Sequence, residues 1–516
     1  MKKKNKKKNI KSKKQPLLLV SLHPQKEKTE TTYQNAITQA YHYASSGNRL
    51  AEYILFQLIE LSPQNLQAYL LLLDFYLVRS SIDQATGVKQ AILARFPNNS
   101  HAIRDIAKFF LVTGDSDEAL RLTNQAIELA PEDPSNYIRQ GNILNAKGQS
   151  KLALDAYFNA IEVDSHNPTA LLQLARSIKT NMPPEKVDHI EKLLISKEFQ
   201  DVERAKLHFA AAWSYGDRDI ENNFKNLDAG NKIITSHHQW DQEKAAKEFD
   251  LISKFISANL VKNMDGAGDF DKKPIMIASM PRSGSTLLEQ ILNAHSKTCA
   301  IGESNAFLQA VAAAGREKQL SPRLWEWPSD ERFSQYIPII DKYWENNYFV
   351  SKADKKRAID KSIDNYQAAG LFLMTFPNAR VIHLRRDPMD IVFSCYQQFF
   401  ESGFNYLFDL KRIAHMILMH EKLMSYWKDL FPEKIMIVHY EDLVNQQETM
   451  TRSILGFCNL EWDEACLNFN HHIDIVRTSS DLQVRKGLHS NAVHKWKNYA
   501  QYLKPAADIL GIELAG

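Results

Sequence analysis

The chain has 516 residues, of which 44% are hydrophobic and 24% are charged, so it is long enough for two to four folded domains and is neither fibrous nor a small disulfide-stapled protein. Its formal charge is +3, but nine lysines and no acidic residue stand between Lys2 and Lys14, so the rest of the chain carries −6. This balance argues against a general nucleic-acid binder. Because a block of like charge is typical of a solvated arm, we expect residues 1–31 to form a basic, disordered tail.

The apolar run that follows these lysines, Leu17 to Val20, is too short for a secretion signal or a membrane span. No other stretch approaches 20 apolar residues. The four cysteines form no CxxC pair and have no histidines at zinc-ligand spacing, which indicates buried free thiols in a reducing compartment. The sequence thus predicts a cytoplasmic protein with no membrane span and no metal site.

A 34-residue period follows the tail. Prolines recur at Pro63, Pro97 and Pro131, and alanines recur at the same interval from Ala51 to Ala153. Small residues at fixed places let paired helices approach closely, and a proline after the second helix prevents its continuation. This pattern resembles the tetratricopeptide repeat, a helix-turn-helix unit, and we assign it to residues 32–180. Such an array leaves a concave surface suited to a protein or peptide partner, although it could also be a plain helical spacer.

Helical periodicity continues through residues 181–265, which we interpret as a helical cap and linker. The stretch Gly266 to Asp269 breaks this pattern, and strands followed by helices begin there. We therefore expect a second domain over residues 266–505, followed by a C-terminal tail over residues 506–516.

The second domain opens with a candidate anion site. An apolar run, Lys273 to Ser279, precedes a small-residue loop, Met280 to Ser285, and a helical stretch begins at Thr286. A strand, a loop and a helix in this order place several backbone N–H groups around one point, which attracts an anion. The loop lacks the lysine and the glycine spacing of the nucleotide P-loop, and this weakens a kinase or ATPase interpretation.

A similar unit follows at Arg380 to Leu384, with a turn at Arg385 to Pro388 and a helix from Met389 to Phe400. Arg386 and Ser394 are eight residues apart, so an arginine at the end of the strand and a serine inside the helix can face one ligand. A third strand, Lys434 to Tyr440, repeats the alternation. Such alternation predicts an α/β domain with a parallel, doubly wound sheet whose ligands bind beyond the carboxyl ends of the strands.

Together, these motifs resemble the sulfotransferases that use 3′-phosphoadenosine 5′-phosphosulfate (PAPS), especially tyrosylprotein sulfotransferases and bacterial proteins that join tetratricopeptide repeats to such a domain. The resemblance covers roughly residues 272–500. It implies that the first loop holds the 5′-phosphosulfate, that an arginine and a serine hold the 3′-phosphate, and that a tyrosine contacts the nucleotide. The residues in these positions are Arg282, Ser283, Gly284, Ser285 and Thr286, then Arg386 and Ser394, then Tyr440.

The same resemblance implies a catalytic set. Glu303, in a Gly-Glu context, corresponds to the family's general base, and Lys361 and Ser480 correspond to groups that stabilise the transition state. Gln483 and Lys495 keep the register of a C-terminal segment that contacts the donor. By analogy with phosphoryl transfer, the protein positions and neutralises charge, so no metal is expected.

These observations favour a sulfotransferase that acts on a hydroxyl of a protein, peptide or glycan, with the repeats recruiting the acceptor or a partner. The competing hypothesis is a repeat scaffold whose second domain binds nucleotide without turnover. Glu303 and Lys361 together favour the enzyme, because a pure binding module needs neither.

Overall fold

The computed structural model describes residues 30–45, 50–79, 81–196, 198–264, 266–321, 323–351, 356–400, 404–471 and 493–514. The lysine-rich segment at Lys2–Lys14, and also Ser480 and Gln483, lie outside these residues. The chain divides into two compact units, one up to Phe75 and one from Tyr76 onwards. The boundaries expected from the sequence after residues 31, 180, 265 and 505 stay predictions.

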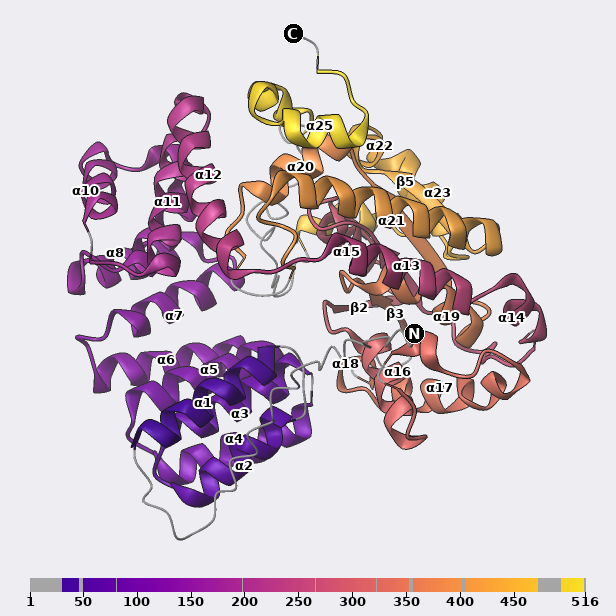
Figure 1. Cartoon of the computed structure of the whole chain (residues 1–516), viewed down its shortest axis with the longest axis horizontal. Helices are drawn as coiled ribbons and strands as arrows, with labels where there is room; N and C mark the ends of the chain where they lie inside the picture. The colour runs from indigo at the N-terminus through magenta and orange to yellow at the C-terminus, as the bar shows by residue number, and fades with distance from the viewer. Residues whose placement is uncertain are drawn as a thin grey trace, which may run out of the picture. The chain divides into compact units, whose positions relative to one another are not determined.

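The repeat region consists of helices joined by short turns (Figure 1). The 34-residue period is visible in the residues that cap the N-termini of the helices. Asn99, Asp133 and Asn167 stand 34 residues apart, and each side chain accepts a hydrogen bond from a backbone N–H in the first turn of the helix that it caps. The helices are α1 (Glu30–Ser45), α2 (Leu50–Leu61), α3 (Leu66–Val78), α4 (Ile82–Arg95), α5 (Ser100–Thr113), α6 (Ser116–Leu129), α7 (Pro134–Ala146), α8 (Ser150–Val163) and α9 (Pro168–Ile178).

The small residues of the period lie where paired helices touch. Ala107, Ala119 and Ala153 are fully buried. Gly141 of α7 lies against the ring of Tyr157 on α8 so closely that a Cβ atom would overlap the ring. The predicted close approach of paired helices is therefore confirmed at this pair.

Further helices follow the repeats: α10 (Pro184–Ile195), α11 (Asp201–Tyr215), α12 (Ile220–His237), α13 (Gln242–Phe255) and α14 (Ala258–Asn263). Two of their polar side chains bind backbone carbonyls at the C-terminal end of helix α20 (Pro388–Tyr396). The indole of Trp213 donates to the carbonyl of Gln397 at 2.8 Å, and the amide of Asn231 donates to that of Tyr396 at 2.8 Å. These bonds use carbonyls that a longer helix would need, and α20 ends at Tyr396, four residues before the predicted end at Phe400.

A five-stranded parallel sheet forms the core of the second domain, in the order β2-β3-β1-β4-β5. Its strands are β1 (Ile275–Ala278), β2 (Thr298–Gly302), β3 (Arg357–Asp360), β4 (Arg380–Arg385) and β5 (Ile435–His439). The sequence predicts β1, β4 and β5. It misses β2 and β3, which are only five and four residues long and have little apolar patterning of their own.

Helices cover both faces of the sheet (Figure 1). Alternate residues of the strands join different apolar clusters: Val381 packs with α19 (Asn365–Thr375), α20 and α21 (Leu410–Leu430), whereas Ile382 packs with α15 (Ser285–Asn293) and α23 (Gln447–Phe457). The remaining helices are α16 (Ala306–Glu317), α17 (Ile337–Glu345), α18 (Tyr348–Ser351), α22 (Tyr440–Asn445) and α25 (Lys504–Leu510). Within the described stretches, no helix combines the length and the apolar character needed to cross a membrane.

Candidate active site

The carboxyl ends of all five strands meet at one edge of the sheet, because every neighbouring pair is parallel. The predicted site residues follow these ends in turn. Glu303 follows β2, Lys361 follows β3, the loop from Ser279 to Gly284 follows β1, Arg386 follows β4, and Tyr440 follows β5. Strand order thus gathers groups as far apart in the sequence as Arg282 and Tyr440, which are separated by 158 residues. In open α/β sheets this edge is where ligands bind.

The loop after β1 turns sharply into helix α15. Arg282 has φ 66° and Gly284 has φ 95°, both in the left-handed region. Glycine is required at position 284 on a second ground, since a Cβ atom there would overlap the ring of Tyr440. Ser285 and Thr286 form the first turn of α15, whose N–H groups and dipole favour an anion. The hydroxyl of Ser283 is buried and has no hydrogen-bond partner among the described residues, so it is a donor left over for a ligand.

Arg282, Arg386 and Ser394 converge beside this loop. The Arg282 Nε donates to the Ser394 hydroxyl at 3.2 Å, and Arg386 donates to the Arg282 carbonyl at 2.8 Å. Arg386 also lies over the ring of Tyr440, 4.9 Å from its centroid, and 3.7 Å from the Asp390 carboxylate.

Burial, together with the positive charges of Arg386 and Arg176, lowers the pKa of Arg282 to about 10. An arginine in this range still carries its charge at neutral pH. Buried guanidinium groups that repel one another gain most from a ligand with several negative charges. Arg176 comes from α9 of the repeat region, and no sequence pattern singled it out.

A second cluster lies at the ends of β2 and β3. The ammonium of Lys361 donates to Glu303 at 2.7 Å and lies 3.6 Å from Glu289. The side chain of Lys361 is 1% exposed and that of Glu289 is 5% exposed, whereas that of Glu303 is 38% exposed. Glu303 therefore faces the solvent side, and Glu289 lies beneath the lysine.

The charges of this cluster depend on one another. Burial alone would lower the pKa of Lys361, but Glu289 and Glu303 raise it, so the ammonium stays protonated. Burial raises the pKa of Glu289, and Lys361 opposes that rise. The partly exposed carboxylate of Glu303 is thus held by the buried ammonium of Lys361, whose second partner, Glu289, is also buried.

The backbone around Glu303 and Lys361 is tightly held. The pairing of β2 with β3 is irregular between Ala300 and Gly302, and Gly302 has φ 68°, which redirects the chain just before Glu303. The buried carboxylate of Asp360 accepts hydrogen bonds from the Ser362 hydroxyl at 2.8 Å and the Asn365 amide at 2.8 Å. Ser362 in turn accepts from the backbone N–H of Asn305 at 2.7 Å. These bonds fix the two loops against each other.

The structure brings together most of the predicted site residues, with one exception. The ammonium of Lys495 pairs at 2.9 Å with Asp217, in the short 3-10 helix Gly216–Arg218 between α11 and α12, and this contact joins it to the helical section. Its predicted contact with the donor stays a prediction. Ser480 and Gln483 lie outside the described residues, so their roles stay predictions as well.

Glu289 is the functional candidate that the sequence analysis missed. It occupies the fourth position of the run Thr286-Leu287-Leu288-Glu289, on a helix whose neighbouring residues are buried. A charged residue within an otherwise apolar stretch was a signal for a buried ion pair. Its partner, Lys361, was not identifiable, because only the strand order brings β3 beside β1.

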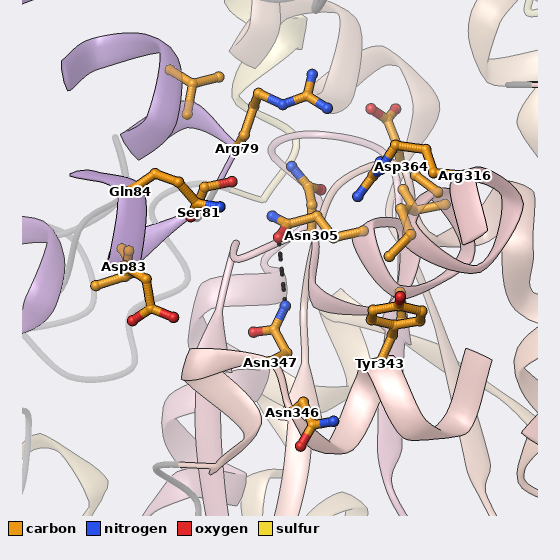
Figure 2. A pocket seen from close by; sticks show the side chains of 17 residues that line it. Arg79, Ser81, Asp83, Gln84, Asn305, Arg316, Tyr343, Asn346, Asn347 and Asp364 are labelled. Atoms are coloured by element: carbon orange, nitrogen blue, oxygen red, sulfur yellow. Dashed lines mark hydrogen bonds between the residues drawn. The ribbon is translucent and has the colours of Figure 1, made fainter. Parts of the chain in front are cut away.

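A polar pocket wall adjoins the Glu303–Lys361 pair. Asn305 stands two residues after Glu303, and Asp364 stands three after Lys361; both line a pocket together with residues of α16 and α17. Figure 2 shows this wall, with Asn305, Arg316, Tyr343, Asn346, Asn347 and Asp364 labelled. Burial raises the pKa of Asp364 to about 6. The wall is rich in amide, hydroxyl and charged groups, which suit a polar ligand.

Residues 274–464 match the sulfotransferase family. An uncharacterized protein of Aquifex aeolicus is 30% identical to this chain over 409 residues, which cover 76% of the chain and 52% of that protein. A protein-tyrosine sulfotransferase of Drosophila melanogaster is 28% identical over 250 residues, or 43% of the chain and 46% of the relative.

Protein-tyrosine sulfotransferase 1 of Danio rerio is 29% identical over 255 residues, or 44% of the chain and 66% of the relative. The chain spans about half the length of the first two of these relatives. The family match begins one residue before β1 and ends beyond α23, so it contains the whole sheet and both clusters of its carboxyl edge. Residues 274–464 are thus a sulfotransferase-family domain, which the chain carries behind a region of tetratricopeptide-type helical repeats.

Proposed function

We propose that the protein transfers a sulfuryl group from PAPS to a hydroxyl of a protein, peptide or glycan. One observation carries this proposal: the same carboxyl edge of the sheet holds a buried arginine cluster at the ends of β1 and β4 and a partly exposed, ion-paired carboxylate at the ends of β2 and β3. The arginine cluster suits a donor with several negative charges, and the carboxylate suits an acceptor that must lose a proton.

In this proposal the donor lies across the loop after β1 and the end of β4. Ser283, Ser285, Thr286 and the backbone of Gly284 hold the 5′-phosphosulfate together with Arg282. Arg386 and Ser394 hold the 3′-phosphate, and the ring of Tyr440 lies beside the nucleotide. The unpartnered hydroxyl of Ser283 and the mutual repulsion of the arginines support this assignment, because an anion satisfies both.

The proposed chemistry is a displacement at sulfur. A bond forms between the acceptor oxygen and sulfur, the bond from sulfur to the 5′-phosphate oxygen breaks, and Glu303 takes the acceptor proton. The 38% exposure of Glu303 supports this role, since an acceptor can reach its carboxylate. Lys361 neutralises charge on the transferring group, and Glu289 is proposed to hold its ammonium in place from below. Adenosine 3′,5′-bisphosphate is the other product.

The acceptor is proposed to approach along the wall that contains Asn305 and Asp364. This wall adjoins the proposed base, and its polar groups suit a peptide or a sugar better than an apolar ring system. The repeats are proposed to recruit the acceptor or a partner protein, because helical arrays offer extended concave surfaces.

Two measurements test the proposed function. Calorimetry of the full chain should show binding of adenosine 3′,5′-bisphosphate without magnesium, whereas a nucleotide kinase would prefer ATP with magnesium. Transfer of labelled sulfate from PAPS into whole-cell extract should then yield a labelled product, which fractionation assigns to protein, sugar or lipid. Binding without transfer to any fraction would support the scaffold hypothesis instead.

A further inference from the structure

A second cluster of titratable side chains lies between the sheet and helix α21, apart from the donor and acceptor groups. His383 comes from β4, and His420 and Glu421 come from α21. The side chains of His383 and His420 are 3% and 1% exposed, and that of Glu421 is 31% exposed. The cluster is therefore buried on the histidine side and reaches solvent through the carboxylate.

The geometry converges on one point. The Nε2 atom of His383 lies 3.5 Å from the Oε1 atom of Glu421, and the Nδ1 atom of His420 lies 3.7 Å from the same oxygen. These separations are longer than good hydrogen bonds. One ligand atom from each residue lies within 4.8 Å of the others.

Three ring nitrogens of the two histidines form no hydrogen bond within the described parts of the chain. The Nε2 atom of His383 and both ring nitrogens of His420 are buried without a hydrogen-bond partner there. Leaving three buried polar atoms unsatisfied costs free energy at each atom, and native structures rarely do so unless water, an ion or a ligand completes the site.

Neighbouring side chains hold the cluster in place. The ring of Tyr366 packs edge-on against His420, with centroids 4.7 Å apart, and Arg385 binds the second oxygen of Glu421 at 2.9 Å. The Oε1 atom of Glu421 is the oxygen that faces both histidines. Neutral imidazoles and an ionised carboxylate are the forms in which such side chains bind metals.

We propose that His383, His420 and Glu421 bind one divalent transition-metal ion, with zinc the preferred metal. Two imidazoles and one carboxylate are a ligand set that zinc accepts, with water as the fourth ligand on the exposed side. Around a tetrahedral zinc the ligand atoms lie about 3.4 Å apart. The Oε1 atom of Glu421 already lies at 3.5 Å and 3.7 Å from the two ring nitrogens that face it, so small shifts of these side chains are sufficient for binding.

The ion ties β4 to α21. Because β4 ends at Arg385 and leads directly into Arg386, the metal stabilises the strand that presents a proposed donor-binding residue. It takes no part in the proposed sulfuryl transfer, which uses the groups of the carboxyl edge.

Another group of carboxylates and histidine, Asp387, Asp390 and His494, is already committed to other bonds. Asp387 accepts from two backbone N–H groups in the first turn of α20. Asp390 accepts from the backbone N–H groups of His494 at 2.6 Å and Trp496 at 3.3 Å. Its oxygens hold a chain segment in place, and we assign it no metal.

Metal titration of the full chain tests the proposal. The protein is prepared without a histidine tag, stripped with EDTA and titrated with Zn²⁺ in competition with a chromophoric chelator; a parallel Co²⁺ titration reports coordination geometry by its absorption spectrum. We expect one tight equivalent in the wild-type protein and a four-coordinate cobalt spectrum. His420→Ala and Glu421→Gln should each weaken that equivalent by about 100-fold or more. Glu421→Gln is the variant that conserves packing.

His415→Ala is the matched control, because it removes the same residue type from α21 outside the cluster. It should bind zinc as the wild type does, and zinc should raise the melting temperature of both proteins but not that of Glu421→Gln. The proposal is overturned if the wild-type protein binds no stoichiometric zinc, or if Glu421→Gln and His420→Ala retain the tight equivalent.

Discussion

Replacing Lys361 by methionine should make the stability of the protein depend strongly on pH. Lys361 is buried between Glu289 and Glu303, and Glu289 is the partner that solvent does not reach. Methionine keeps the length of the side chain and removes the charge. Glu303 then regains water, but Glu289 must either stay ionised without a counter-ion or take up a proton.

The magnitude follows from these two options. At 3.6 Å and an effective dielectric constant of about 20, the Glu289–Lys361 attraction is about 5 kcal/mol. If Glu289 instead takes up a proton, no uncompensated charge is buried. Protonating it costs about 1.4 kcal/mol for each pH unit above its ordinary pKa of 4.5. The second option is the cheaper one below about pH 8. It costs less than about 1 kcal/mol at pH 5 and about 4 kcal/mol at pH 7.5.

The sign of the pH dependence is fixed by the direction of the shift. Burial raises the pKa of Glu289 above its unfolded value. A group of this kind contributes stability that is present below the unfolded pKa and is lost as pH rises through the folded pKa. Removing Lys361 raises the pKa of Glu289 in the folded state further, so the variant loses more stability than the wild type as the pH rises. Lys361 itself has a raised pKa, so its own proton is not lost between pH 5 and pH 8.

Scanning calorimetry of the full chain at pH 5.0, 6.5 and 7.5 measures the effect. The melting temperature of Lys361→Met should fall below that of the wild type by roughly 8–16 °C at pH 7.5 and by a few degrees at pH 5. The double variant Glu289→Gln/Lys361→Met is the control, and its difference from the wild type should vary little with pH. Equal differences at pH 5 and pH 7.5 for the single variant would refute the buried carboxylate–ammonium pair.

Three further substitutions test the site. Arg386→Ala should weaken calorimetric binding of adenosine 3′,5′-bisphosphate by roughly 10- to 150-fold, as expected for losing a charged hydrogen bond of about 1.5–3 kcal/mol, and unchanged affinity would contradict the 3′-phosphate site. Glu303→Gln should keep that affinity but slow single-turnover transfer by roughly 10²–10⁴-fold, and a wild-type rate would remove Glu303 from the mechanism. Gly284→Ala should abolish donor binding, because φ is 95° and a Cβ would overlap Tyr440. Gly456→Ala, with no atom within 4 Å of its Cβ, should bind the donor normally, and equal binding by both variants would contradict the loop geometry.

The sequence was sufficient wherever structure follows from short-range pattern. The 34-residue period reflects contacts between neighbouring helices, such as Gly141 with Tyr157, and caps such as Asn99 and Asp133 that act within one turn. The loop after β1 was identifiable for the same reason, because its strand, small residues and helix are consecutive.

Some site residues could be predicted only from the resemblance to sulfotransferases, because no local physical pattern marks them. Glu303 and Lys361 are single charged residues directly after short, weakly patterned strands, and the resemblance to sulfotransferases selected them. The structure adds that they form an ion pair at 2.7 Å and that the two loops holding them are bonded through Ser362.

Only the tertiary structure decided which buried charges meet. Glu289 meets Lys361 because the sheet order places β3 beside β1, although 72 residues separate the two side chains. His383 meets His420 because α21 packs on the face of β4 that carries His383. A carboxylate, an ammonium and an imidazole carry no local signal for their partners, and Coulomb attraction acts only once packing has removed the water between them.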